Sequence, residues 1–334
     1  SRGPEGSGDE AVPAPFLDRP CTSGLGRRHL RAFTVLELLA VIAVVVMAGL
    51  MLVPAWARTK PNVHAFQCLE DLRRLEGAIT MYTHDNHDLF PPNPDDGNTV
   101  PGYAWVAGQA FGGMPPANSP AGEATDPDYI MLPQYDLIAT YIASTPGVFK
   151  CPSDPRHGFY GGTDPNLKGT IIPYVRSISM NQGVGTVDPV FAADGGGHAG
   201  KPTLPVNGPW LDGYHSHRAG HPYLTFGRTT DFGFASPAGI FVLADENPWS
   251  INDAALAVIA AQPTVTDYPA SYHNNGGSFS FADGHAEIHQ WLSTVMALAG
   301  PARETVAPPG TPGYDDWHWF ASHATKNVNT GNVP

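Results

Sequence analysis

An uninterrupted apolar segment near the N-terminus constrains this chain more than any other feature. Residues 33–55 read FTVLELLAVIAVVVMAGLMLVPA, and Glu37 is the only charged side chain among these 23 residues. The hydrocarbon core of a bilayer requires about 20 apolar residues in a helix, whereas a surface helix of a soluble protein is apolar on one face only. The segment therefore predicts a membrane-spanning helix at residues 33–56.

The charges before this segment predict its orientation. Arg27, Arg28 and Arg31 directly precede it, and positively charged residues tend to stay on the cytoplasmic side. We therefore expect everything after residue 56 to lie outside the cytoplasm. A cleavable secretory signal is the competing interpretation, but its apolar core would span only about 7–15 residues.

Glu37 is the most unusual residue of the segment. A carboxylate within hydrocarbon costs several kcal/mol unless it is paired or lies near an interface, so an acid in this position is by default a functional candidate. We therefore expect Glu37 to have a cationic partner.

The residues around Glu37 resemble the type IV prepilin signature. In that family a basic leader ends in a small residue, Phe follows, and Glu stands at the fifth position after the cut. Ala32 and Phe33 occupy the cleavage positions here, with Ala32 in place of the usual Gly. The resemblance implies that a prepilin peptidase removes the leader, residues 1–32, and that the new N-terminus at Phe33 is methylated.

The resemblance also implies a function in assembly. The amino group of Phe33 would neutralise Glu37 of the same or a neighbouring subunit. The chain would be a structural subunit of a type IV pilus-like or type II secretion-like filament. Its partners would be other pilin-like subunits, an inner-membrane assembly platform and membrane lipid. We expect a single-pass bacterial inner-membrane protein with an extracytoplasmic C-terminal domain, and then a periplasmic or cell-surface filament.

The remainder of the chain predicts an α+β fold. Leu69, Leu72, Leu75, Ile79 and Tyr82 recur at spacings of three and four, which indicates an amphipathic helix continuing over residues 57–88. Abundant Gly and Pro beyond it indicate short strands joined by loops. The expected architecture is pilin-like: one long helix, half membrane-spanning and half amphipathic, packed on an antiparallel sheet.

Several boundaries follow from local signals. We expect a β-rich globular domain at residues 89–300 and a loosely held tail at 301–334, where Pro308 and Pro309 interrupt a stretch with little apolar periodicity. The candidate strands are 103–107, 169–175, 239–244 and 279–291, and 136–144 is a candidate short helix. Asp283 and Gly284 form a typical hairpin-turn signal.

Motifs in the globular domain extend the resemblance. The stretches around Cys68 and Cys151 are similar to landmarks of bacterial prepilin-like proteins associated with type II secretion. His273 followed, after nine residues, by Asp283 and Gly284 resembles the H-x9-DG pattern of one subgroup. Together these similarities cover most of residues 27–291.

Two cysteines remain outside the leader, which contains Cys21. In an exported domain Cys68 and Cys151 are candidates for a disulfide. The sequence does not determine how far apart they lie, so the bridge stays an open alternative.

Polar clusters suggest metal sites. Alternation along a strand would place His285 and His289 on one face, and carboxylates after the apolar run 240–243 offer the oxygen ligands that Ca²⁺ prefers. Each cluster is equally explained by turns and solvated strand faces. The candidate ligands are Asp245, Glu246, His273, Asp283, His285 and His289. A structural Ca²⁺ is the cofactor considered, and none is certain.

The charge balance and the motifs of the chain argue against some classes of function. Beyond residue 32 the chain has 13 basic and 27 acidic residues, and phosphate binding depends on Lys and Arg, so we expect no nucleic-acid partner. We find no phosphate loop or nucleophile-elbow motif and predict no enzyme. Two rivals remain: a metal-dependent enzyme on a membrane anchor, and a non-polymerising binding or adhesion module contacting glycans through Tyr103, Trp105 and Trp210.

Overall fold

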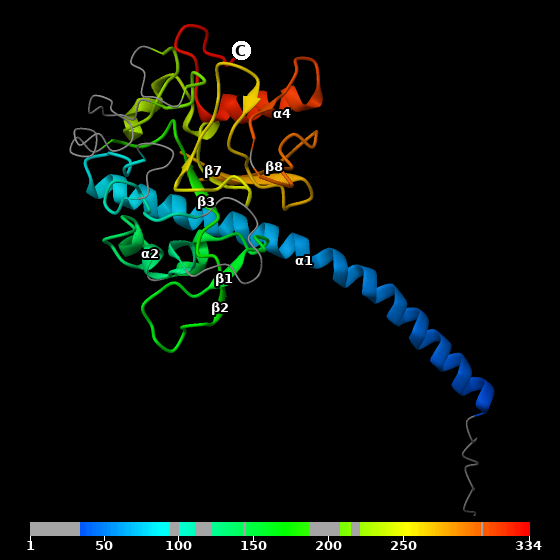
Figure 1. The fold of residues 1–334 in the computed structure, drawn as a ribbon. Coiled ribbons are helices and arrows are strands. Elements are labelled where there is room, and N and C mark those ends of the chain that lie inside the picture. The colour runs from blue at the N-terminus through cyan, green and yellow to red at the C-terminus, as the bar shows by residue number, and fades with distance from the viewer. Residues whose placement is uncertain are drawn as a thin grey trace, which may run out of the picture. The chain divides into compact units, whose positions relative to one another are not determined.

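The chain forms two compact units, residues 1–54 and residues 55–334. The computed structural model describes residues 34–93, 100–110, 122–142, 145–187, 208–214, 221–301 and 303–334. Helix α1 (Val35–Asp85) begins in the first unit and ends in the second (Figure 1).

The last turns of α1 carry the apolar stripe that its spacing predicted. Leu72, Leu75 and Ile79 are fully buried, and Leu69 and Tyr82 are partly buried. The helix stops where His87 and Asp88 adopt positive φ angles of 59° and 63°. Prolines at 91 and 92 follow, and proline cannot continue a helix interior.

A five-stranded sheet forms the centre of residues 55–334, in the order β5-β3-β4-β7-β8. Its strands are β3 (Ile178–Asn181), β4 (Phe241–Asp245), β5 (Ala255–Leu256), β7 (Gly276–Phe281) and β8 (Ala286–Gln290). Strands β7 and β8 form the hairpin predicted at Asp283-Gly284, with Ser278 opposite Ile288. Gly284 has a φ of +89°, a conformation that glycine adopts without steric cost.

The two faces of the sheet are covered by different helices. On one face Val242 and Leu243 share a core with Leu72 and Leu75 of α1. On the other, Phe279 shares a core with residues of α4 (Pro312–Ala324). Figure 1 shows the sheet between the end of α1, in cyan, and α4, in red. Because β4 and β7 are covered on both faces, every residue in them is buried.

Short elements complete the body. Strands β1 (His157–Phe159) and β2 (Ile171–Pro173) pair with each other, as do β6 (Thr264–Val265) and β9 (Thr305–Val306). The remaining helices are short: η1 (Glu123–Thr125), α2 (Asp128–Met131), η2 (Ala139–Tyr141), η3 (Pro146–Phe149), η4 (Thr229–Gly233) and η5 (Pro237–Gly239).

The predicted fold class is wrong. Among the residues that the structure describes, no helix combines the length and the apolar character needed to cross a membrane. The central sheet is mixed rather than antiparallel, because the chain leaving β4 crosses back to the outer side of β3 and places β5 parallel to it. Short 3-10 helices and two-stranded sheets make up much of the rest.

The tail predicted at residues 301–334 is also wrong, because α4 belongs to the core. Thr311 caps this helix by accepting the N–H of Tyr314, and Pro312 occupies its first turn, where proline is tolerated. Trp317 and Phe320 are each 1% exposed. The prolines that suggested a loose tail therefore precede a helix rather than exclude one.

Candidate functional site

Four side chains with metal-binding chemistry meet inside the body. They are Cys68, Cys151, Asp245 and His273, and their ligand atoms all lie within 4.8 Å of one another. None of the four is more than 4% exposed.

Each of these side chains comes from a different part of the chain. Cys68 lies on the buried face of α1, one turn before Leu72, and Cys151 follows η3. Asp245 is the last residue of β4. His273 precedes β7, where Asn274 and Asn275 turn the chain with φ angles of 58° and 61°. The cluster therefore joins α1, a loop and two neighbouring strands of the sheet.

Hydrogen bonds orient part of the cluster. The N–H of Cys151 donates to Oγ of Ser177 at 2.9 Å, and the Ser177 hydroxyl donates to Oδ1 of Asp245 at 2.6 Å. Sγ of Cys151 lies 3.4 Å from Nε2 of His273. Within the described part of the chain, Oδ2 of Asp245 and Nδ1 of His273 are buried without a hydrogen-bond partner. Such atoms are uncommon in folded proteins and call for an explanation. A bound ion would explain Oδ2 of Asp245, whereas an ion on Nε2 of His273 would leave Nδ1 unpaired.

Burial controls the protonation of the cluster. It raises the pKa of Asp245 to about 7, against a hydrogen bond from Ser177 that lowers it. Burial also raises the pKa of the Cys151 thiol. It lowers the pKa of His273 to about 4, with a further lowering from His64. His273 is therefore a neutral imidazole at neutral pH, the form that binds metals.

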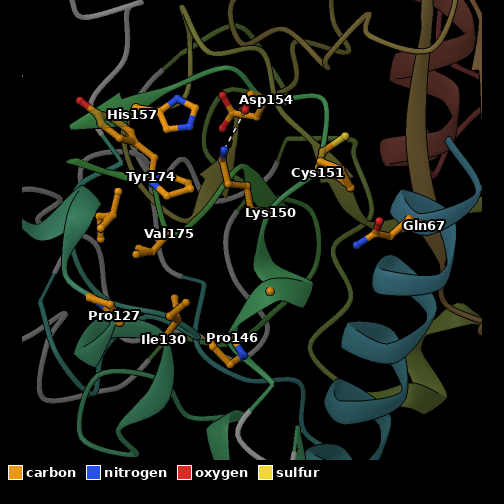
Figure 2. A pocket seen from close by; sticks show the side chains of 14 residues that line it. Gln67, Pro127, Ile130, Pro146, Lys150, Cys151, Asp154, His157, Tyr174 and Val175 are labelled. Carbon is orange, nitrogen blue, oxygen red and sulfur yellow. Dashed lines mark hydrogen bonds between the residues drawn. The ribbon is translucent and has the colours of Figure 1, made fainter. Parts of the chain in front are cut away.

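A pocket of about 490 Å³ adjoins the cluster at Cys151. Figure 2 shows Gln67 reaching toward it from α1, with Lys150 and Cys151 adjacent on one loop. Nζ of Lys150 donates to the backbone carbonyl of Asp154 at 2.7 Å, and burial lowers the pKa of this lysine. Of the four cluster residues, Cys151 alone lines this pocket.

A buried ion pair supports the same loop. Nη2 of Arg156 lies 2.8 Å from Oδ2 of Asp154, and both side chains are fully buried. Arg156 also donates to the carbonyls of Ala110 and Arg176. The segment carrying Cys151 is thus tied to two other segments of the body, at Ala110 and Arg176.

The predicted metal ligands do not form one site. Asp245 and His273 meet, but Glu246 accepts a hydrogen bond from Ser250 at 2.8 Å instead. Asp283 and His285 pair with each other at the hairpin turn, where both are substantially exposed. His289 stacks on Trp319 at a centroid distance of 3.7 Å.

The cysteines were the ligands that sequence reasoning missed. They were considered only as a disulfide, and both are free thiols buried in the structure. A signal was present in the sequence, because two cysteines considered as disulfide partners are also a pair of candidate metal ligands.

The start of α1 holds Glu37, one of the two residues predicted for assembly. Oε2 of Glu37 accepts the N–H of Thr34 at 2.9 Å and its hydroxyl at 3.0 Å, while Oγ of Thr34 accepts the N–H of Glu37 at 3.3 Å. This is a capping-box arrangement, which stabilises a helix N-terminus. The predicted processing residues Ala32 and Phe33 lie outside the described residues.

The aromatic residues of the adhesion alternative do not form an exposed platform. Trp105 is fully buried, and its Nε1 donates to the carbonyl of Ala254 at 2.9 Å. Tyr103 and Trp210 are only partly exposed.

No protein-family model, curated protein or solved structure matches the chain. Its function is therefore inferred from its own residues.

Proposed function

We propose that this chain is a structural subunit of an extracytoplasmic filament of the type IV pilus or type II secretion kind. A prepilin peptidase would cut between Ala32 and Phe33, and an inner-membrane platform would add the subunit to the filament. The segment at the start of α1 would hold the subunit at the bacterial inner membrane before assembly.

One observation carries this proposal: a single acid, held by a capping box, stands on an otherwise apolar and exposed helix. Ten large apolar side chains between Val35 and Met47 are 49–79% exposed. A soluble monomer rarely exposes so large a contiguous apolar patch, and such patches mark interaction surfaces. The surface requires an apolar partner, and the same segment of other subunits supplies one.

The capping box gives Glu37 a defined position in that surface. Thr34 holds the carboxylate at the first turn, and cleavage would create an amino group at Phe33, the residue directly before Thr34 in the sequence. Pairing with this ammonium group, in the same or a neighbouring subunit, would remove the cost of a charge among apolar side chains. Glu37 would then select subunits that align correctly.

The test compares Glu37→Ala and Glu37→Gln with a control, Glu304→Ala, which removes an exposed acid from the body. N-terminal sequencing of the extracted protein reports cleavage at Phe33, and pelleting of sheared filaments reports assembly. Both Glu37 variants should be retained with the membrane fraction but lost from filaments, whereas the control should assemble. Normal filament incorporation of the Glu37 variants, or a natural protein that retains residues 1–32, would overturn the proposal.

A further inference from the structure

We propose that Cys68, Cys151, Asp245 and His273 bind one borderline-soft divalent metal ion of the Zn²⁺ class. This structural site would fasten α1 to the end of the central sheet. It is independent of the proposed filament function, because all four ligands belong to residues 55–334.

The ligand types select the class of metal. Thiolate, imidazole and carboxylate are all ligand types that bind Zn²⁺. Ca²⁺ takes six to eight oxygen ligands, and two sulfur atoms in a cluster of four exclude that geometry. The calcium expectation therefore does not fit these residues, whereas a four-coordinate zinc site does.

The distances suit a tetrahedral ion. Zn–S bonds of about 2.3 Å and Zn–N or Zn–O bonds of about 2.0 Å place neighbouring ligand atoms roughly 3.3–3.8 Å apart. The separation of 3.4 Å between Sγ of Cys151 and Nε2 of His273 already lies in this range. All of the ligand atoms lie within 4.8 Å of one another. The two atoms that are farthest apart would have to approach each other by about 1 Å when the ion binds.

The carboxylate supplies an independent indication of a ligand. Ser177 donates to one oxygen of Asp245, whereas Oδ2 is buried and has no hydrogen bond within the described residues. An oxygen left unpaired in this way costs free energy, and a metal ion would satisfy it. Metal ligands are commonly held by such outer hydrogen bonds, which orient the donor atom.

Charge balance is also favourable. Metal binding would release both thiol protons to solvent. The two thiolates and the carboxylate then carry three negative charges, one more than a divalent ion neutralises. Lys150 and Arg156 both act electrostatically on Asp245. Because Arg156 is already paired with Asp154, the charge of Lys150 is the one that would offset the remaining negative charge of the loaded site.

The burial of all four ligands indicates a structural rather than a catalytic ion. A catalytic zinc keeps an open coordination position for water or substrate, whereas a structural zinc is closed by four protein ligands. The four side chains here are at most 4% exposed.

A disulfide between Cys68 and Cys151 is the competing state of the same residues. It would remove both thiolates and leave Asp245 and His273 without a cation. The two states are mutually exclusive, so one set of measurements distinguishes them.

The experiment uses the full chain, extracted in detergent and purified without chelator. Elemental analysis should find about one zinc per chain. Alkylation in denaturant, without reductant, should modify both Cys68 and Cys151, in addition to Cys21 where the leader is retained. Replacement of the ion by Co²⁺ should produce sulfur-to-cobalt charge-transfer absorption and the visible bands of tetrahedral cobalt. These measurements on the unmodified chain do not depend on whether a variant folds.

Variants then assign the ligands. Cys68→Ser and His273→Gln should weaken Co²⁺ binding by more than the roughly 10–100-fold expected for loss of an outer-shell partner. His285→Gln, which removes a partly exposed histidine at the hairpin turn, should bind Co²⁺ like the natural chain. A chain that takes up no Zn²⁺ or Co²⁺ would overturn the site, as would cysteines that resist alkylation until they are reduced.

Discussion

The hydroxyl of Ser177 donates a 2.6 Å hydrogen bond to Oδ1 of Asp245. Ser177 accepts the N–H of Cys151 at the same time, so one small side chain connects two of the four proposed ligands. The bond occupies one carboxylate oxygen and leaves Oδ2 for a different partner. Ser177 is thereby a positioning residue for the cluster.

Substitution of Ser177 by Ala should weaken metal binding without removing a ligand. Loss of an outer-shell hydrogen bond typically reduces metal affinity by roughly 10–100-fold, because the ligand is no longer held in its binding orientation. Titration of the chain with Co²⁺, followed by its visible absorption, measures the change.

Ser179→Ala is the matched control for this measurement. Ser179 is fully buried in β3, two residues from Ser177, but its hydroxyl has no hydrogen-bond partner in the described part of the chain. Its removal should leave Co²⁺ affinity unchanged. Equal affinities for the two variants would show that Ser177 does not position Asp245.

Glu76 should make stability depend on pH. This acid of α1 is almost fully buried, and burial raises its pKa to about 8 from 4.5, although a hydrogen bond from Ser280 lowers it. The folded state therefore binds the proton more tightly than the unfolded state. The stabilisation is fully present below about pH 4.5 and is lost as the pH rises through about 8.

Glu76→Gln removes this titration while retaining a side-chain oxygen for Ser280. The variant should match the natural chain at about pH 4 and should be more stable by on the order of 2 kcal/mol near pH 9. Urea unfolding of both proteins at the two pH values checks the prediction. Glu304→Gln, at an exposed position, should show no such difference. A difference in unfolding free energy between Glu76→Gln and the natural chain that is the same at both pH values would contradict the prediction.

Parts of the fold could be predicted because they depend on local patterns. The apolar run at 240–243 identified a buried strand, and β4 (Phe241–Asp245) lies there. The Asp283-Gly284 turn and the stripe on α1 are likewise local signals, and both were confirmed. Residues 103–107, predicted as a strand, form only an isolated bridge from Val106 to Asp136, because their aromatic content reflected burial rather than extended pairing.

The cluster could be predicted only in part. Its four ligands are separated by long stretches of sequence, and only tertiary packing brings them together. Asp245 and His273 were named for their chemistry, but they were grouped with two histidines that lie elsewhere. His285 pairs with Asp283 at the hairpin turn before β8, and His289 stacks on Trp319. The alternation of side chains along a strand predicts which residues share one face of the sheet. It does not predict which loops pack against that face.

Substitution of Trp317 tests whether the C-terminal helix α4 is part of the folded core. Its side chain is 1% exposed, and its Nε1 donates to the carbonyl of Ile259 at 2.8 Å. Trp317→Ala should therefore lower the free energy of unfolding by about 3–5 kcal/mol, through the cavity it leaves and the unpaired carbonyl. Urea unfolding of the full chain, monitored by circular dichroism, measures this loss.

Phe234→Ala provides the contrast, because Phe234 is 92% exposed and its removal should change stability by less than about 0.5 kcal/mol. If residues 301–334 were a loose tail, Trp317→Ala would be as mild as Phe234→Ala, since an exposed side chain has no core packing to lose.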